Sequence, residues 1–153
     1  MVYEYTLTRR RISDELTKAG NAADLIPFLT SHCFHEEEMG TESCWLLTLD
    51  KDLIVQGAML MSKGCTDSCC LDQRDALFAA VSSRAYAVII AHNHPTGDPR
   101  PSKYDIKTTE AFNKACKVLG IHMLDHIILA DGRYFSFADE REDSFTWPSE
   151  PRR

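Results

Sequence analysis

The chain lacks several features that mark whole classes of protein. No apolar stretch approaches the ~18 residues that a membrane-spanning helix needs, and the N-terminus has no apolar core of the kind found in signal peptides. Positive charge is scarce, since 17 Lys and Arg against 23 Asp and Glu give a net charge of −6, which repels phosphate backbones. We therefore expect a cytoplasmic protein with no membrane partner and no direct binding to nucleic acid.

The six cysteines lack the spacing of a metal or disulfide framework. In a reducing cytosol most of them should be free thiols. Cys65, Cys69 and Cys70 lie close together, but no Cys-x-x-Cys pair and no nearby histidine completes a soft-metal cluster. We interpret them as ordinary thiols, with a second metal site as the alternative.

The sequence also lacks internal repeats, low-complexity tracts and linkers, so its 153 residues indicate a single domain. Capping residues and hydrophobic periodicity predict helices that begin at Asn21, Asp72 and Ser102. Strands are predicted at 2–7, 43–50, 53–61, 85–91, 121–130 and 133–139, and the tail after residue 140 should be loose. Strands that alternate with helices, and two hairpin-like connections, predict an α/β (α+β-like) domain with a mixed sheet.

The segment AHNHPTGDPRPSKYD, residues 91–105, follows the predicted buried strand directly. His92 and His94 are two residues apart on an extended segment, so their side chains point to the same side. A proline-rich bend then leads to Asp105, in the first turn of the next predicted helix. Two imidazoles and one carboxylate are the ligand set of a hydrolytic zinc centre, which keeps one position for water.

Asp105 has a second explanation. Ser102-x-x-Asp105 is also a capping box, in which both side chains satisfy free amides at the start of a helix. That explanation alone does not account for two histidines at the end of an apolar strand. The two roles are compatible, because the amides around a helix start can hold a carboxylate in place for a metal.

The combination of His92-x-His94-Pro95 with Ser102-x-x-Asp105 resembles the JAMM motif of the JAB/MPN metallopeptidase superfamily. Two longer segments are most similar to the RadC branch: AVIIAHNHPTGDPRPSKYDI and LGIHMLDHIILADGRYFSFADE. The resemblance implies a curved mixed β-sheet flanked by helices, the JAB/MPN (cytidine-deaminase-like) architecture, with one zinc ion per chain. It divides the chain into an N-terminal strand and helix segment packed on the same domain, a catalytic domain and a polar C-terminal tail, at residues 1–41, 42–140 and 141–153.

The resemblance further implies a zinc-dependent hydrolase of peptide or isopeptide bonds. Its substrate would be a peptide or protein, ubiquitin-like modifiers included. Carried over residue by residue, the zinc ligands are His92, His94 and Asp105, and Ser102 hydrogen-bonds near the reacting water and the oxyanion. Glu42, at the start of the strand 43–50, becomes the general acid and base. Because Glu42 follows three other glutamates, a solvated loop acid is the alternative for it.

His126 occupies a position typical of RadC-like sequences, where it and Asp125 can orient a metal ligand. A structural histidine in a strand explains it equally well, so we leave it out of the site. One departure from the family is Asp72-Gln73-Arg74-Asp75, where relatives usually carry a His-Pro-Arg-Glu opening.

Two other functions stay open at this stage. One is an accessory or binding module in DNA repair or replication without hydrolase activity, the historical association of the RadC name. The other is a metal-stabilised structural domain, although a purely structural zinc site tends to be closed by a fourth protein ligand. The sequence does not specify the substrate or the oligomeric state.

Overall fold

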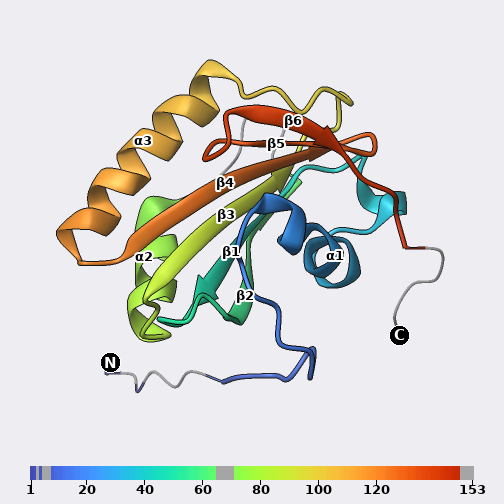
Figure 1. Ribbon diagram of the computed structural model, residues 1–153. Coiled ribbons are helices and arrows are strands. Elements are labelled where there is room, and N and C mark those ends of the chain that lie inside the picture. Colours follow the sequence, from blue (N-terminus) through green and yellow to red (C-terminus); the bar gives the residue numbers. More distant parts are fainter. Residues whose placement is uncertain (3, 5–7, 65–70, 149–153) are drawn as a thin grey trace.

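The computed structural model describes residues 1–2, 4, 8–64 and 71–148. Six strands form one sheet in the order β2-β1-β3-β4-β5-β6, in which β3 and β4 are parallel and all other neighbours are antiparallel (Figure 1). This confirms the predicted single domain with a mixed sheet. The elements are α1 (Ala22–His32), a 3-10 turn (Glu36–Glu38), β1 (Ser43–Leu49), β2 (Val55–Lys63), α2 (Gln73–Ser82), β3 (Ala87–Asn93), α3 (Lys103–Val118), β4 (His122–Ala130), β5 (Arg133–Ser136) and β6 (Arg141–Ser144).

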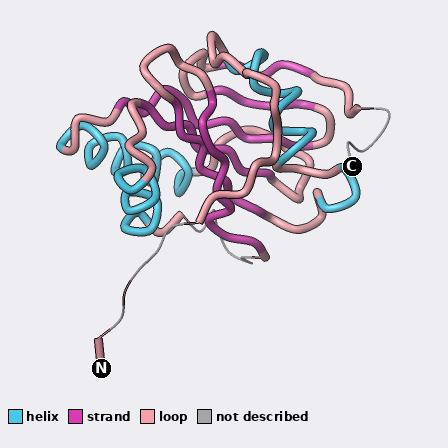
Figure 2. Tube along the Cα trace, turned by 90° about the horizontal axis from the view of Figure 1, so that it is seen from below, coloured by secondary structure: helices cyan, strands magenta, loops and turns pink. Residues whose placement is uncertain are grey.

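Helices cover both faces of the sheet, so that β1 and β3 are sandwiched between two hydrophobic clusters. Successive strand side chains point to opposite faces, and Leu47 and Ile89 pack with α1 while Leu46 and Ile90 pack with α2 and α3. Figures 1 and 2 show the helices on either side of the strands. Every residue of β3 is buried, which is why its sequence is an almost continuous apolar run.

The three helices begin where their capping residues predict. Asn21 and Asp24 form a capping box at α1, and Pro27 is accommodated inside that helix. The Asp72 side chain accepts a hydrogen bond from the Arg74 amide at the start of α2. None of the helices in the described ranges is long and apolar enough to cross a membrane.

The C-terminal tail differs from the loose segment that was predicted. Arg141–Ser144 forms β6, which pairs with β5 at the edge of the sheet, and all four residues are exposed. The aromatic rings of Phe145 and Trp147 then pack against the cluster on the α1 face. A short polar edge strand has no hydrophobic alternation, so no periodicity in the tail indicates it. The strand predicted at 2–7 falls largely outside the described residues, and Cys65, Cys69 and Cys70 fall entirely outside them.

Candidate metal centre

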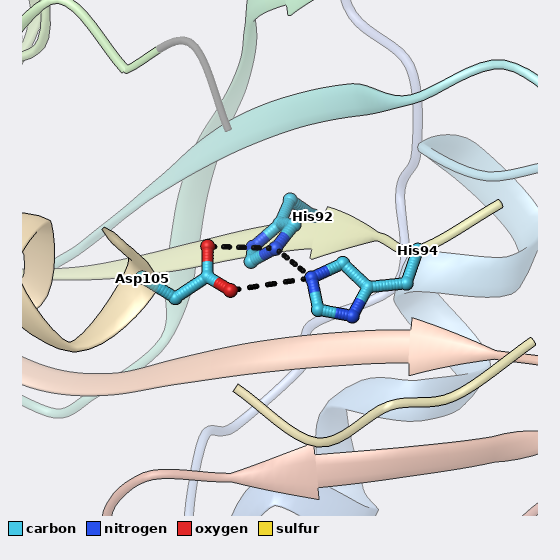
Figure 3. Close-up of side chains that lie close together, drawn as sticks. All are labelled: His92, His94 and Asp105. Atoms are coloured by element: carbon cyan, nitrogen blue, oxygen red, sulfur yellow. Dashed lines mark hydrogen bonds and ion pairs between the residues drawn. The ribbon is translucent and has the colours of Figure 1, made fainter. Parts of the chain in front are cut away.

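Three predicted side chains converge where β3 ends and α3 begins (Figure 3). His92 lies in β3, His94 directly follows the strand, and Asp105 lies in the first turn of α3. The two Nε2 atoms of the histidines are 2.9 Å apart. Asp105 Oδ1 is 3.3 Å from His92 Nε2, and Asp105 Oδ2 is 3.3 Å from His94 Nε2. Atoms that share a tetrahedral zinc ion lie roughly 3.3 Å apart, because each zinc–ligand bond is about 2.0–2.1 Å.

The surrounding hydrogen bonds turn lone pairs, not protons, towards the centre of this cluster. His94 Nδ1 lies 2.8 Å from the backbone carbonyl of Asp98, which can only accept. The neutral His94 ring therefore carries its proton on Nδ1 and leaves Nε2 bare. Facing it are the second imidazole nitrogen and a carboxylate, so the donor set fits a cation such as zinc.

The electrostatics of the cluster also favour a cation. Burial opposes charge on His94, yet the Asp105 carboxylate, the Asp98 carbonyl and the charge of Glu42 together raise the pKa of His94. Burial opposes charge on Asp105 as well, but His94, the charge of His92 and the hydrogen bonds from Ser102 hold the pKa of Asp105 well below its usual range. Asp105 is therefore an anion at neutral pH.

Ser102 fixes the position of the Asp105 carboxylate. The Ser102 amide and hydroxyl each donate to Asp105 Oδ2 at 2.7 Å, and the Asp105 amide donates back to Ser102 Oγ at 3.1 Å. The capping box and the His92, His94 and Asp105 cluster thus coexist on one carboxylate, as the sequence suggested. The Ser102 hydroxyl proton is used by Asp105 here, and the oxyanion role implied by the resemblance stays a prediction.

Access to the cluster is from the His94 side. His92 and Asp105 are buried, whereas 16% of the His94 side chain is exposed. Glu42 directly precedes β1 and lies two residues before Cys44, the residue of β1 that pairs with His92. The charge of Glu42 contributes to the raised pKa of His94. Its part in catalysis stays a prediction.

Asn93, which the sequence analysis passed over, ties the chain around Glu42 to the end of β3. Its Oδ1 accepts hydrogen bonds from the Ser43 amide at 2.8 Å and the Ser43 hydroxyl at 3.2 Å. Its Nδ2 donates to the carbonyls of Met39 at 3.1 Å and Thr41 at 3.0 Å. The residues on both sides of Glu42 are thereby held by one buried side chain.

His126, which was left out of the predicted site, contacts one of its residues, His92. Its Nε2 lies 2.7 Å from His92 Nδ1, and its Nδ1 lies 2.6 Å from the Thr109 hydroxyl. Burial, and then the nearby His92, lower the pKa of His126 well below its usual value. The Asp125 side chain does not join the His126 ring; it accepts from the His126 amide, the Ser136 hydroxyl and the Ala138 amide.

Comparison with known proteins agrees with this architecture. A sequence model of the family described as the RadC-like JAB domain matches residues 19–142. The chain belongs to the RadC-like JAB domain family. This confirms the resemblance to RadC-like sequences that was inferred from the motif residues. It establishes the type of domain and names no reaction.

Among the relatives of this RadC-like domain are proteins called UPF0758, a name that states no activity. The relative from Porphyromonas gingivalis is 37% identical over 88% of this chain and 60% of its own length. The relative from Thermotoga maritima is 33% identical over 87% of this chain and 60% of its own length. A third, from Aquifex aeolicus, is 55% identical over 44% of this chain and 29% of its own length. The chain thus spans no more than 60% of these relatives.

Proposed function

We propose that this RadC-like domain is a zinc-dependent hydrolase of peptide or isopeptide bonds, with His92, His94 and Asp105 as the metal ligands. The observation that carries the proposal is the convergence of two imidazole nitrogens and one carboxylate, at 2.9 to 3.3 Å, with the hydrogen-bonded Nδ1 atoms of both histidines turned away. Three protein ligands leave one position for water, which is the arrangement of catalytic zinc sites.

When bound, a zinc ion supplies a Lewis acid that lowers the pKa of a water molecule to about 7. Glu42 accepts the proton of the attacking water and then donates it to the amide nitrogen, so that the carbon–nitrogen bond breaks and a neutral amine leaves. Asn93 supports this role because it holds the backbone on both sides of Glu42. Ser102 keeps Asp105 in place, and its hydroxyl must turn away from Asp105 Oδ2 to stabilise the oxyanion.

The substrate class follows from the family resemblance together with the open side of the cluster. His94 is partly exposed and Glu42 is half-buried, so these are the side chains of the proposed site that a carbonyl group would meet from solvent. An extended peptide or the tail of a ubiquitin-like modifier presents such a carbonyl. The net charge of −6 gives no support to a phosphate-bearing substrate such as duplex DNA.

Two measurements on the purified protein test the proposal. Elemental analysis should find about one zinc per chain in the wild type and none in His94→Ala. The control His122→Ala, which replaces an exposed histidine, should retain the zinc. Zinc-loaded protein should cleave linear peptides or ubiquitin-like fusions, and Glu42→Gln should lower turnover by roughly 100-fold or more. Glu37→Gln, a change of an exposed acid near Glu42, should leave turnover unchanged.

The outcomes separate the competing functions. A protein that binds zinc but cleaves none of these substrates faster than its Glu42→Gln variant has a structural metal site and not a hydrolytic one. Salt-sensitive binding to DNA at low ionic strength, without turnover, would favour the accessory module in repair or replication.

A further inference from the structure

On the Nδ1 side of His92 lies a series of buried and partly buried hydrogen bonds to which the proposed reaction assigns no role. It runs from His92 Nδ1 to His126 Nε2 at 2.7 Å, and from His126 Nδ1 to Thr109 Oγ1 at 2.6 Å. The last hydrogen bond joins Thr109 Oγ1 to the backbone carbonyl of Asp105, at 2.6 Å. These hydrogen bonds therefore connect one proposed metal ligand, His92, to the backbone of another, Asp105.

The position of every proton in this series of hydrogen bonds follows from its last acceptor, the backbone carbonyl of Asp105. A carbonyl oxygen can only accept, so the single hydroxyl proton of Thr109 must point to Asp105. Thr109 Oγ1 then has only lone pairs left for His126, whose Nδ1 must carry a proton and donate it. This sets the tautomer of His126 without reference to any metal.

The same logic passes through His126 to His92. His126 has no exposed surface, and neither of its ring nitrogens contacts a carboxylate, so a second proton on this ring would be a buried charge without an anionic partner in contact. His126 Nε2 is therefore an acceptor, and His92 Nδ1 donates to it. The remaining nitrogen of His92, Nε2, is left bare and faces His94 and Asp105.

The ring of His126 is also held in orientation. It stacks on Phe137 with ring centroids 4.9 Å apart and an angle of 9° between the planes. Its backbone amide is held by the Asp125 carboxylate at 2.7 Å. A fixed ring in contact with His92 fixes the direction in which the His92 lone pair points.

We propose that Thr109 and His126 are positioning residues that lock the proton of His92 on Nδ1 and so present its Nε2 to the metal. The inference rests on the metal centre of the proposed function, and it adds two residues that contact no metal. Ligating histidines usually donate their second nitrogen to a carboxylate, a carbonyl or water. Here a neutral imidazole takes that place, so the partner of His92 adds no charge to the centre.

Replacement of Thr109 by Val tests the inference, because valine keeps the shape of the side chain and removes its oxygen. His126 Nδ1 then loses its acceptor, and the tautomer of His126 that opposes metal binding by His92 becomes accessible. The zinc dissociation constant, measured by competition with a chromophoric chelator, should rise by roughly 10- to 100-fold in Thr109→Val. Thr109→Ser, which restores the hydroxyl, should return to within about threefold of the wild type.

The matched control is Thr108→Val. Thr108 is the preceding residue of α3, is buried where Thr109 is half-buried, and makes no side-chain hydrogen bond within the described part of the chain. Thr108→Val should bind zinc as tightly as the wild type. A Thr109→Val protein that binds zinc like this control would overturn the inference.

A second measurement reads the tautomers directly and does not depend on metal or activity. In the metal-free wild type, NMR of isotope-labelled ring nitrogens should find the proton of His126 on Nδ1, and Thr109→Val should change that signal. A wild-type proton on His126 Nε2 alone would overturn the proposal. Tight zinc binding with the expected tautomers but without peptide cleavage would instead contradict only the hydrolase function, so the two failures are distinguishable.

Discussion

Replacement of Asp105 by Asn separates the two roles that meet on this carboxylate. The Ser102 amide can only donate, so it requires the carbonyl oxygen of the new side chain to take the place of Oδ2, 2.7 Å away. The NH₂ group of the introduced asparagine then occupies the place of Oδ1, 3.3 Å from His92 Nε2, with its protons towards the cluster. The start of α3 keeps its cap, whereas the centre loses its only anionic ligand and gains two donors.

The size of the effect follows from linkage. A ligand that binds only the folded protein stabilises it by about 2.7 kcal/mol at a free concentration of 100 Kd. For a domain of this size 1 kcal/mol corresponds to about 2–4 °C, so zinc at that concentration should raise the Tm of the wild type by roughly 5–11 °C. In Asp105→Asn the same zinc concentration should raise the Tm by less than about 2 °C.

Thermal unfolding with and without zinc measures this difference, and the start of α2 provides the control. Asp72 also accepts a backbone amide at a helix start, from Arg74 at 2.8 Å, and it is not part of the cluster. Asp72→Asn should keep the full increment from zinc. An Asp105→Asn protein with the same increment as the wild type would show that Asp105 is not a ligand. A wild type that zinc does not stabilise would refute the metal centre itself.

Three further changes test other parts of the structure. Asn93→Ala should lower turnover by about 100-fold while zinc content is unchanged, because it releases the backbone around Glu42. The control Asn113→Ala, on α3, should preserve both turnover and zinc content. Equal turnover in the two variants would argue against a role for Asn93 in placing Glu42. Asp125→Ala leaves one hydroxyl and two amides without their acceptor, so urea unfolding should show a loss of at least about 2 kcal/mol, and an unchanged midpoint would contradict it. Burial raises the pKa of Cys116 to about 11, so its thiol is protonated at about pH 8 and should react with iodoacetamide only after unfolding. Rapid modification of Cys116 itself in the native protein, located by peptide mass spectrometry, would disprove this.

The convergence of His92, His94 and Asp105 was predictable because the three residues are close in the sequence and their directions follow from local geometry. Strand alternation aims His92 and His94 to one side, and a helix that begins at Ser102 brings Asp105 back to them. The helix starts were predictable for a similar reason, since capping depends on residues within one turn.

The residues that were missed depend on contacts between elements that are distant in the sequence. His126 meets His92 because β3 and β4 are parallel, with Ile90 paired to His126 and His92 to Ile128. Thr109 joins them only because α3 packs over this part of β4. No spacing rule within one segment encodes that register, and a buried polar residue in a strand has the same local sequence whether it faces a metal ligand or not.

The alternation of side chains along β3 explains how one short segment can serve both faces of the sheet. Ile90 and His92 point to the face covered by α3, and Ile89 and Asn93 point to the face covered by α1. A slip of one residue in the pairing of β3 would exchange these faces, burying Asn93 against α3 and moving both histidines away from Asp105. The apolar residues that precede His92 oppose that slip, because helices bury both faces of the strand and side chains of matching shape fill each side. The register that packs the core therefore also places the two imidazoles beside the carboxylate and the amide of Asn93 beside the chain that carries Glu42.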